Sequence, residues 1–257
     1  MSLQLNNAEQ IYQEFYGRNI DQMPALIKQG FLPIPVAQLM QRRLDVLGKG
    51  QDLVDTWWNN YFDTGDAIAY HPDGQVKIDL DSSIARQFNP GSNIVHGKFV
   101  LPEGEYEQIA GQEFSKEETE KYALRKSLTL RQAMNNPIWR ALARDPKLHE
   151  EYAKAVFKEA NTRYGNERNM GVCISNSPEV PSMGLWLVGG LDYGYSLASG
   201  SYALDGSSGR LVGVAPEAQY AAKITSPSLD QILAVCAPFI APANMAAVRE
   251  GVGKLYQ

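Results

Sequence analysis

The sequence predicts an α+β fold in which antiparallel β meanders pack against helices. Three observations favour this class. A hairpin signal over residues 65–81 fixes its own register. The spacing of apolar residues changes from the helical period to strand-like alternation and back along the chain. The predicted strands do not alternate singly with helices, which disfavours a doubly wound parallel sheet.

Length and composition fit one folded domain. The chain has 257 residues, of which 44% are hydrophobic and 21% are charged, and a chain of this size buries a substantial core. We therefore expect a single domain over residues 1–257, with an N-terminal helical subdomain at about residues 1–60. Divisions near residue 115 or residue 168 are alternatives, although no linker marks either place.

The first sixty residues are expected to be helical. Asn6 or Asn7 would cap a first helix that ends at Gly17. Apolar residues at helical spacing, with glycine stops, predict further helices at residues 22–28, at 36–47 and from residue 51 into the hairpin.

Residues 65–81 carry the clearest local signal. Pro72, Asp73 and Gly74 suit the successive positions of a three-residue hairpin loop. Placing His71 opposite Gln75 fixes every pair outward from the turn, and opposed residues share a face. The face expected to be buried carries Ile68, Tyr70, Val76, Ile78 and Leu80. The face expected to be polar carries His71, Gln75, Lys77, Asp79 and Asp81, with Ala67 and Ala69 between them.

The remaining elements follow from turn and capping residues. Strands are expected near residues 93–101, 171–175, 184–188 and 201–214. If the 93–101 strand joins the hairpin with Val95 and Phe99 inward, His96 lies on the same face as His71. Helices are expected from residue 115, at 138–142, at 145–165 and, near the C-terminus, at 226–240 and 243–255.

The polar face of this sheet is the first candidate site. His71, Asp79, Asp81 and His96 would gather there. Two carboxylates spaced two residues apart on one strand, with histidine nearby, suit a divalent cation or a catalytic base with its orienting group. The alternative is a solvated face on which Lys77 and Lys98 neutralise the acids. We favour the alternative, because antiparallel sheets commonly leave one face wet.

A basic stretch over residues 121–144 is the second candidate site. Its cations are Lys121, Arg125, Lys126, Arg131, Arg140 and Arg144, and Trp139 lies among them. Arginines beside an indole suit binding of a phosphate or stacking on a base. The alternative, which we favour, is a helical surface whose arginines pair with acids elsewhere. The net charge of −5 also argues against a general nucleic-acid binder.

Other chemistry has less support. A glycine-rich stretch from residue 188, with Tyr193, Tyr195 and Tyr202, is a candidate binding loop, although a plain connection explains it better. Cys173 and Cys236 are interpreted as inert apolar thiols, and His149 as an exposed residue. The sequence lacks a nucleophile elbow, a phosphate-loop motif and a zinc-ligand motif.

These observations rank three functions without deciding between them. The first is a binding or protein-interaction protein, with a protein partner or self-association. The second is a metal-dependent hydrolase or phosphotransfer enzyme that uses the polar sheet face, and the third is a nucleic-acid-associated protein that uses residues 121–144. No cofactor is expected, except the divalent metal of the second function. No run reaches the ~18 apolar residues of a membrane helix, and no secretory signal is evident, so a cytoplasmic location is expected.

Overall fold

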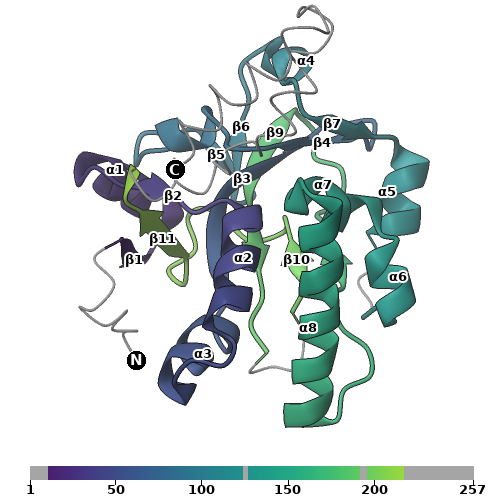
Figure 1. Ribbon diagram of the computed structural model, residues 1–257. Coiled ribbons are helices and arrows are strands. Elements are labelled where there is room, and N and C mark those ends of the chain that lie inside the picture. Colours follow the sequence, from purple (N-terminus) through teal and green to yellow (C-terminus); the bar gives the residue numbers. More distant parts are fainter. Residues whose placement is uncertain (1–10, 124–126, 192–195, 217–257) are drawn as a thin grey trace, which may run out of the picture. The chain divides into compact units, whose positions relative to one another are not determined.

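The computed structural model describes residues 11–123, 127–191 and 196–216, which belong to one compact unit. A mixed sheet of many strands packs against helices (Figure 1), and the α+β class is confirmed. The two predicted C-terminal helices, at 226–240 and 243–255, lie outside the described residues. The single domain over residues 1–257 stays a prediction for the same reason.

The sheet is organised around the long strand β3. Its main path runs in the order β1 (Tyr12–Tyr16), β11 (Arg210–Val214), β3 (Phe62–Tyr70), β9 (Ser182–Val188), β10 (Ala198–Ser199) and β8 (Val172–Cys173). Shorter strands branch from this path: β2 (Leu32–Pro33), β4 (Val76–Asp79), β5 (Ile94–Val95), β6 (Lys98–Val100) and β7 (Gln112–Phe114). Most pairs are antiparallel, as predicted, but β11 with β3 and β10 with β8 are parallel.

One edge of β3 is shared between two partners. Strand β9 pairs along the other edge, whereas β11 pairs at Asp63 and β4 pairs at residues 67–70. The register shifts between Asp63 and Ala67. There Gly65 leaves the ladder, bonding to Ile34 through its N–H and to Ser82 through its carbonyl. The sheet therefore forks at this point, as bulges allow.

Helices cover the sheet on both faces. They are α1 (Asn19–Lys28), α2 (Val36–Val46), α3 (Gln51–Trp58), α4 (Glu105–Gln108), α5 (Lys116–Tyr122), α6 (Leu130–Met134), α7 (Pro137–Ala143) and α8 (Pro146–Tyr164), with the 3-10 helix η1 (Ala85–Gln87). Helices α2 and α8 run side by side over one face (Figure 1). The predicted caps are confirmed: Ser115 and Glu118 form the capping box of α5, and Asp145 caps α8.

The predicted hairpin register is confirmed. Strand β3 pairs with β4 through Tyr70 and Val76, Ala69 and Lys77, Ile68 and Ile78, and Ala67 and Asp79. The turn closes with the N–H of His71 bonded to the carbonyl of Gln75 at 2.9 Å. All the residues of the predicted apolar face are buried except Leu80, which is 37% exposed.

The predicted wet face of the hairpin is wrong. Ala67 and Ala69 are fully buried, in one apolar cluster with residues of α1 such as Met23. Lys77 is 9% exposed, and its ammonium donates to the carbonyl of Tyr106 at 3.0 Å. Lys98 is 5% exposed and donates to two backbone carbonyls rather than to the acids. A second layer covers this face because the alanines leave room for it to approach.

Three predicted elements differ from the structure. Residues 12–16 form strand β1 instead of a helix, since they pair with β11 from the far end of the unit. The expected strand at 93–101 is a tight hairpin, in which His96 and Gly97 turn the chain with φ of 50° and 77°. In the 201–214 region only β11 is a strand, and residues 202–204 form no strand.

Candidate functional site

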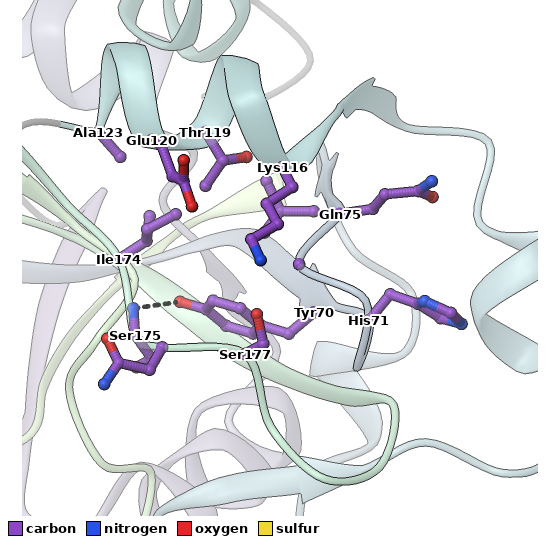
Figure 2. Close-up of a pocket in the computed structure, with 13 residues that line it drawn as sticks. Tyr70, His71, Gln75, Lys116, Thr119, Glu120, Ala123, Ile174, Ser175 and Ser177 are labelled. Atoms are coloured by element: carbon purple, nitrogen blue, oxygen red, sulfur yellow. Dashed lines mark hydrogen bonds between the residues drawn. The ribbon is translucent and has the colours of Figure 1, made fainter.

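A pocket of about 350 Å³ lies where three segments meet: the tip of the β3–β4 hairpin, helix α5, and residues 174–177 (Figure 2). Its apolar lining includes Tyr70, Val76 and Ile174, all of which are buried. Lys116 and Glu120 supply charged groups at its border. Ligand sites commonly have a volume of about 300–1,000 Å³ and combine apolar walls with a few polar groups, so this pocket suits a small ligand.

Tyr70 forms a fixed part of the pocket lining. Its side chain is 1% exposed, and its hydroxyl donates to the carbonyl of Gly200 at 2.8 Å. The same oxygen accepts the N–H of Ser175 at 3.4 Å (Figure 2). Burial raises the pKa of Tyr70, so the phenol stays neutral at physiological pH. It therefore joins β3 to the backbone beside β8 and β10, and presents its ring to the pocket.

Gly74 sets the position of Lys116. It has a φ of 96°, which favours glycine. A Cβ at this position would lie 2.8 Å from Cγ of Lys116. The aliphatic part of Lys116 therefore packs closely on the hairpin turn, and its side chain points away from α5 toward the pocket (Figure 2). The capping box of α5 holds the first turn of the helix beside the hairpin.

Glu120 lies one helical turn after Lys116, and its carboxylate points toward Ile174 (Figure 2). Between them, the hydroxyl of Thr119 is buried and has no hydrogen-bond partner in the described part of the chain. This wall of the pocket was not predicted from the sequence. Its only local signal was the capping box, because the pocket depends on the contact of α5 with the hairpin and with residues 174–177.

The structure does not bring the predicted histidines and acids into one cluster. His71 lines the pocket, but its ring points away from it (Figure 2), with Nδ1 2.7 Å from the carboxylate of Asp73. His96 lies exposed in the β5–β6 turn, so its expected place on the sheet face is wrong. Asp79 is the last residue of β4 and is partly buried. Across the described residues, no group of three or more His, Cys, Asp or Glu side chains could hold a metal ion.

Asp81 and Arg144, which the sequence placed in separate candidate sites, form an ion pair at 2.7 Å. The other nitrogen of the Arg144 guanidinium lies 2.5 Å from Asp66, whose side chain is fully buried. Burial raises the pKa of Asp66, and the charge of Arg144 opposes this shift. Asp66 also accepts the backbone N–H groups of Val36 and Asp81, each at 2.8 Å. The contacts of Arg144 with Asp66 and Asp81 therefore join the two candidate sites and hold the backbone together at this point.

The rest of the basic stretch is divided between surface and core. Arg125 and Lys126 lie outside the described residues. Arg131 and Arg140 are exposed. Trp139 is fully buried and donates its indole N–H to the carbonyl of Met170 at 2.8 Å, so it is not available to stack on a base. Arg144 pairs with acids elsewhere in the fold, as the favoured alternative states.

Other single candidates also change. The expectation that His149 is exposed is wrong: it is 2% exposed, and burial lowers its pKa to about 4. Cys173 lies partly buried in β8, with Sγ 3.6 Å from the hydroxyl of Ser201. Tyr202 is 50% exposed. Tyr193, Tyr195 and Cys236 lie outside the described residues.

Comparison with known proteins gives one structural likeness. No family model and no curated protein matches the chain. A solved structure matches with a TM-score of 0.60 and 16% sequence identity, covering 79% of this chain and 97% of the other. Its description concerns how the C-type lectin fold accommodates massive sequence variation in Nanoarchaeota. The chain is similar to this fold. At such low identity the likeness concerns the fold alone, and among the described helices none is long and apolar enough to span a bilayer.

Proposed function

We propose that this chain is a cytosolic binding protein whose binding site is the pocket between the β3–β4 hairpin, α5 and residues 174–177. The observation that carries this proposal is the composition of the pocket. A buried apolar lining lies beside Lys116 and Glu120, and neither of these side chains forms an ion pair with a described residue. A side chain of a partner protein, or a free small molecule, would bury apolar surface in the pocket and form polar contacts at its border.

The similar fold supports a binding role. The solved structure with this fold is described as accommodating massive sequence variation. A scaffold that keeps its core while its surface residues change suits a protein whose function is recognition, because loops carried by a rigid scaffold often hold binding residues. We extend only this tolerance to the present chain.

The two alternative functions have less support. A metal-dependent enzyme would need His71 and Asp81, but these residues are engaged by Asp73 and Arg144. A nucleic-acid site would lack the base-stacking contact of Trp139, which is buried. Among the cations of residues 121–144, Arg144 is engaged by Asp66 and Asp81, and anion binding by the others stays a proposal.

A fragment screen observed by protein NMR tests the binding role. We expect some fragments to shift the backbone resonances of Tyr70, Thr119 and Ile174, which lie around the pocket. The variant Ser177→Trp should abolish these shifts by filling the pocket. The matched variant Ser207→Trp, at an exposed position outside the lining, should retain them. If no fragment shifts the pocket residues, or if Ser177→Trp leaves the shifts unchanged, the proposal is wrong.

A further inference from the structure

Two opposite charges stand on the pocket side of α5 without pairing. Lys116 and Glu120 are four residues apart, so they project from the same side of the helix. Both line the pocket. Within the described ranges, neither side chain makes an ion pair or a hydrogen bond, although Lys147 with Glu151 and Lys154 with Glu150 pair at this spacing.

Helix α8 shows what such pairs do elsewhere in this chain. Lys147 with Glu151, in the same order as Lys116 with Glu120, approaches to 3.9 Å. Arg163 with Glu159 closes to 3.0 Å. On α5, the lysine stem contacts the hairpin turn at Gly74 and its ammonium points away from the helix, whereas the carboxylate of Glu120 points toward Ile174 (Figure 2). The hairpin turn therefore keeps the two charges apart, and both remain available to an occupant of the pocket.

The surface between the charges is apolar. Tyr70, Val76 and Ile174 are 1%, 3% and 8% exposed, and they line the same pocket. A ligand body that contacts them gains from burial, at about 25 cal/mol per Å² of apolar surface removed from water. A simple anion or a simple cation would engage one charge only and would leave the other without a partner.

We propose that the pocket binds a small zwitterion: one molecule that carries an ammonium group, a carboxylate and a short apolar side chain, as an amino acid does. The carboxylate contacts the ammonium of Lys116, the ligand ammonium contacts Glu120, and the apolar part lies against Tyr70. This inference rests on the proposed binding function and names the ligand class of the same pocket.

Three compounds with the same ring test the inference. L-phenylalanine carries both charged groups, phenethylamine lacks the carboxylate, and 3-phenylpropanoate lacks the ammonium. Titration of the full chain, followed by NMR at the pocket resonances, should show phenylalanine binding up to about fivefold more tightly than either analogue, since ion pairs to exposed side chains such as Lys116 and Glu120 contribute up to about 1 kcal/mol each.

The variants separate the two charges. Lys116→Met should reduce the affinity for phenylalanine to that for phenethylamine and leave phenethylamine unchanged. Glu120→Gln should reduce it to that for 3-phenylpropanoate and leave that compound unchanged. The control variants Lys121→Met and Glu167→Gln remove exposed charges that do not line the pocket, and should alter none of the three affinities.

The outcomes distinguish the inference from the function on which it rests. Equal affinities for the three compounds, absence of binding by all of them, or insensitivity to both pocket variants would overturn the zwitterion as ligand. The binding function would still stand if other fragments shift the pocket resonances and Ser177→Trp abolishes those shifts. Circular dichroism and a thermal melt of each variant establish that it is folded, and any variant that fails is replaced by Lys116→Gln or Glu120→Ala.

Discussion

Arg144 and Asp66 form an ion pair at 2.5 Å, although Asp66 is fully buried and Arg144 lies at the end of a helix far along the chain. Arg144 has a φ of 61°, and its second partner, Asp81, has a φ of 52°. Both residues adopt a conformation that is uncommon outside glycine. Asp66 also accepts the N–H of Val36, at the start of α2. The pair therefore fixes the fork of the sheet to α2 and to the end of α7.

Removing the charge of Asp66 should destabilise the protein strongly. Asp66→Asn removes the buried partner of Arg144, which keeps only Asp81, and the loss of a charged hydrogen bond to a buried carboxylate should cost about 1.5–3 kcal/mol. The matched change Asp55→Asn breaks the more exposed ion pair with Arg163 and should cost under about 1 kcal/mol. Urea unfolding of both variants measures the difference. Similar free energies of unfolding would contradict a central role for Asp66.

The interior position of Ala69 gives a second prediction. It is fully buried against the layer that contains α1. Ala69→Leu should overpack this layer and lower the free energy of unfolding by about 1–3 kcal/mol. The measurement is chemical denaturation of the two proteins. A change within about 0.5 kcal/mol, as is usual for surface positions, would show that the face is wet after all.

His149 predicts a dependence of stability on pH. Burial, aided by the charge of Arg140, lowers its pKa from 6.5 to about 4. Between pH 4 and pH 6.5, His149 is therefore protonated in the unfolded chain and neutral in the folded chain. The contribution of His149 to the free energy of unfolding should rise with pH from about 4 to 6.5, by as much as about 3 kcal/mol, and be lost as the pH returns to 4.

The variant His149→Gln isolates this contribution from that of Asp63. Burial raises the pKa of Asp63 from 3.8 to about 6, which gives a slope of the opposite sign. Stability from Asp63 is present below its unfolded pKa and is lost as the pH rises through about 6. Because both proteins share Asp63, the difference between their free energies of unfolding should follow His149 alone. A difference that does not vary with pH would refute the assignment.

The close contact of Gly74 with Lys116 gives a prediction that connects the hairpin turn with the proposed binding site. Gly74→Ala places a Cβ at a φ of 96° and 2.8 Å from the Lys116 stem. We expect a loss of stability of about 1 kcal/mol or more and weaker binding of phenylalanine. Gly48→Ala is the matched control, since Gly48 has a φ of 81° but nothing within 4 Å of the added Cβ. Gly48→Ala should lose stability and keep its affinity for phenylalanine. An equal loss of affinity in Gly48→Ala and Gly74→Ala would show that the position of Lys116 does not determine binding.

Local chemistry made some of this structure predictable. The hairpin register followed from a turn sequence and from side-chain alternation, and the caps of α5 and α8 followed from Ser115 and Asp145, because each depends on residues close in the chain. Strand β1 was not predictable in this way, since its partner β11 comes nearly two hundred residues later. The two unpaired charges of the pocket were not predictable for the same reason. The position of Lys116 depends on its contact with Gly74, which lies far from it in the sequence.

The divided edge of β3 separates two neighbourhoods of the protein. Its N-terminal half belongs with β11 and β1, while its C-terminal half belongs with β4 and the hairpin tip. Strand β9 spans the division and holds both halves in one ladder. We therefore expect insertions or substitutions at the hairpin tip to leave the pairing of β3 with β11 at its opposite end intact.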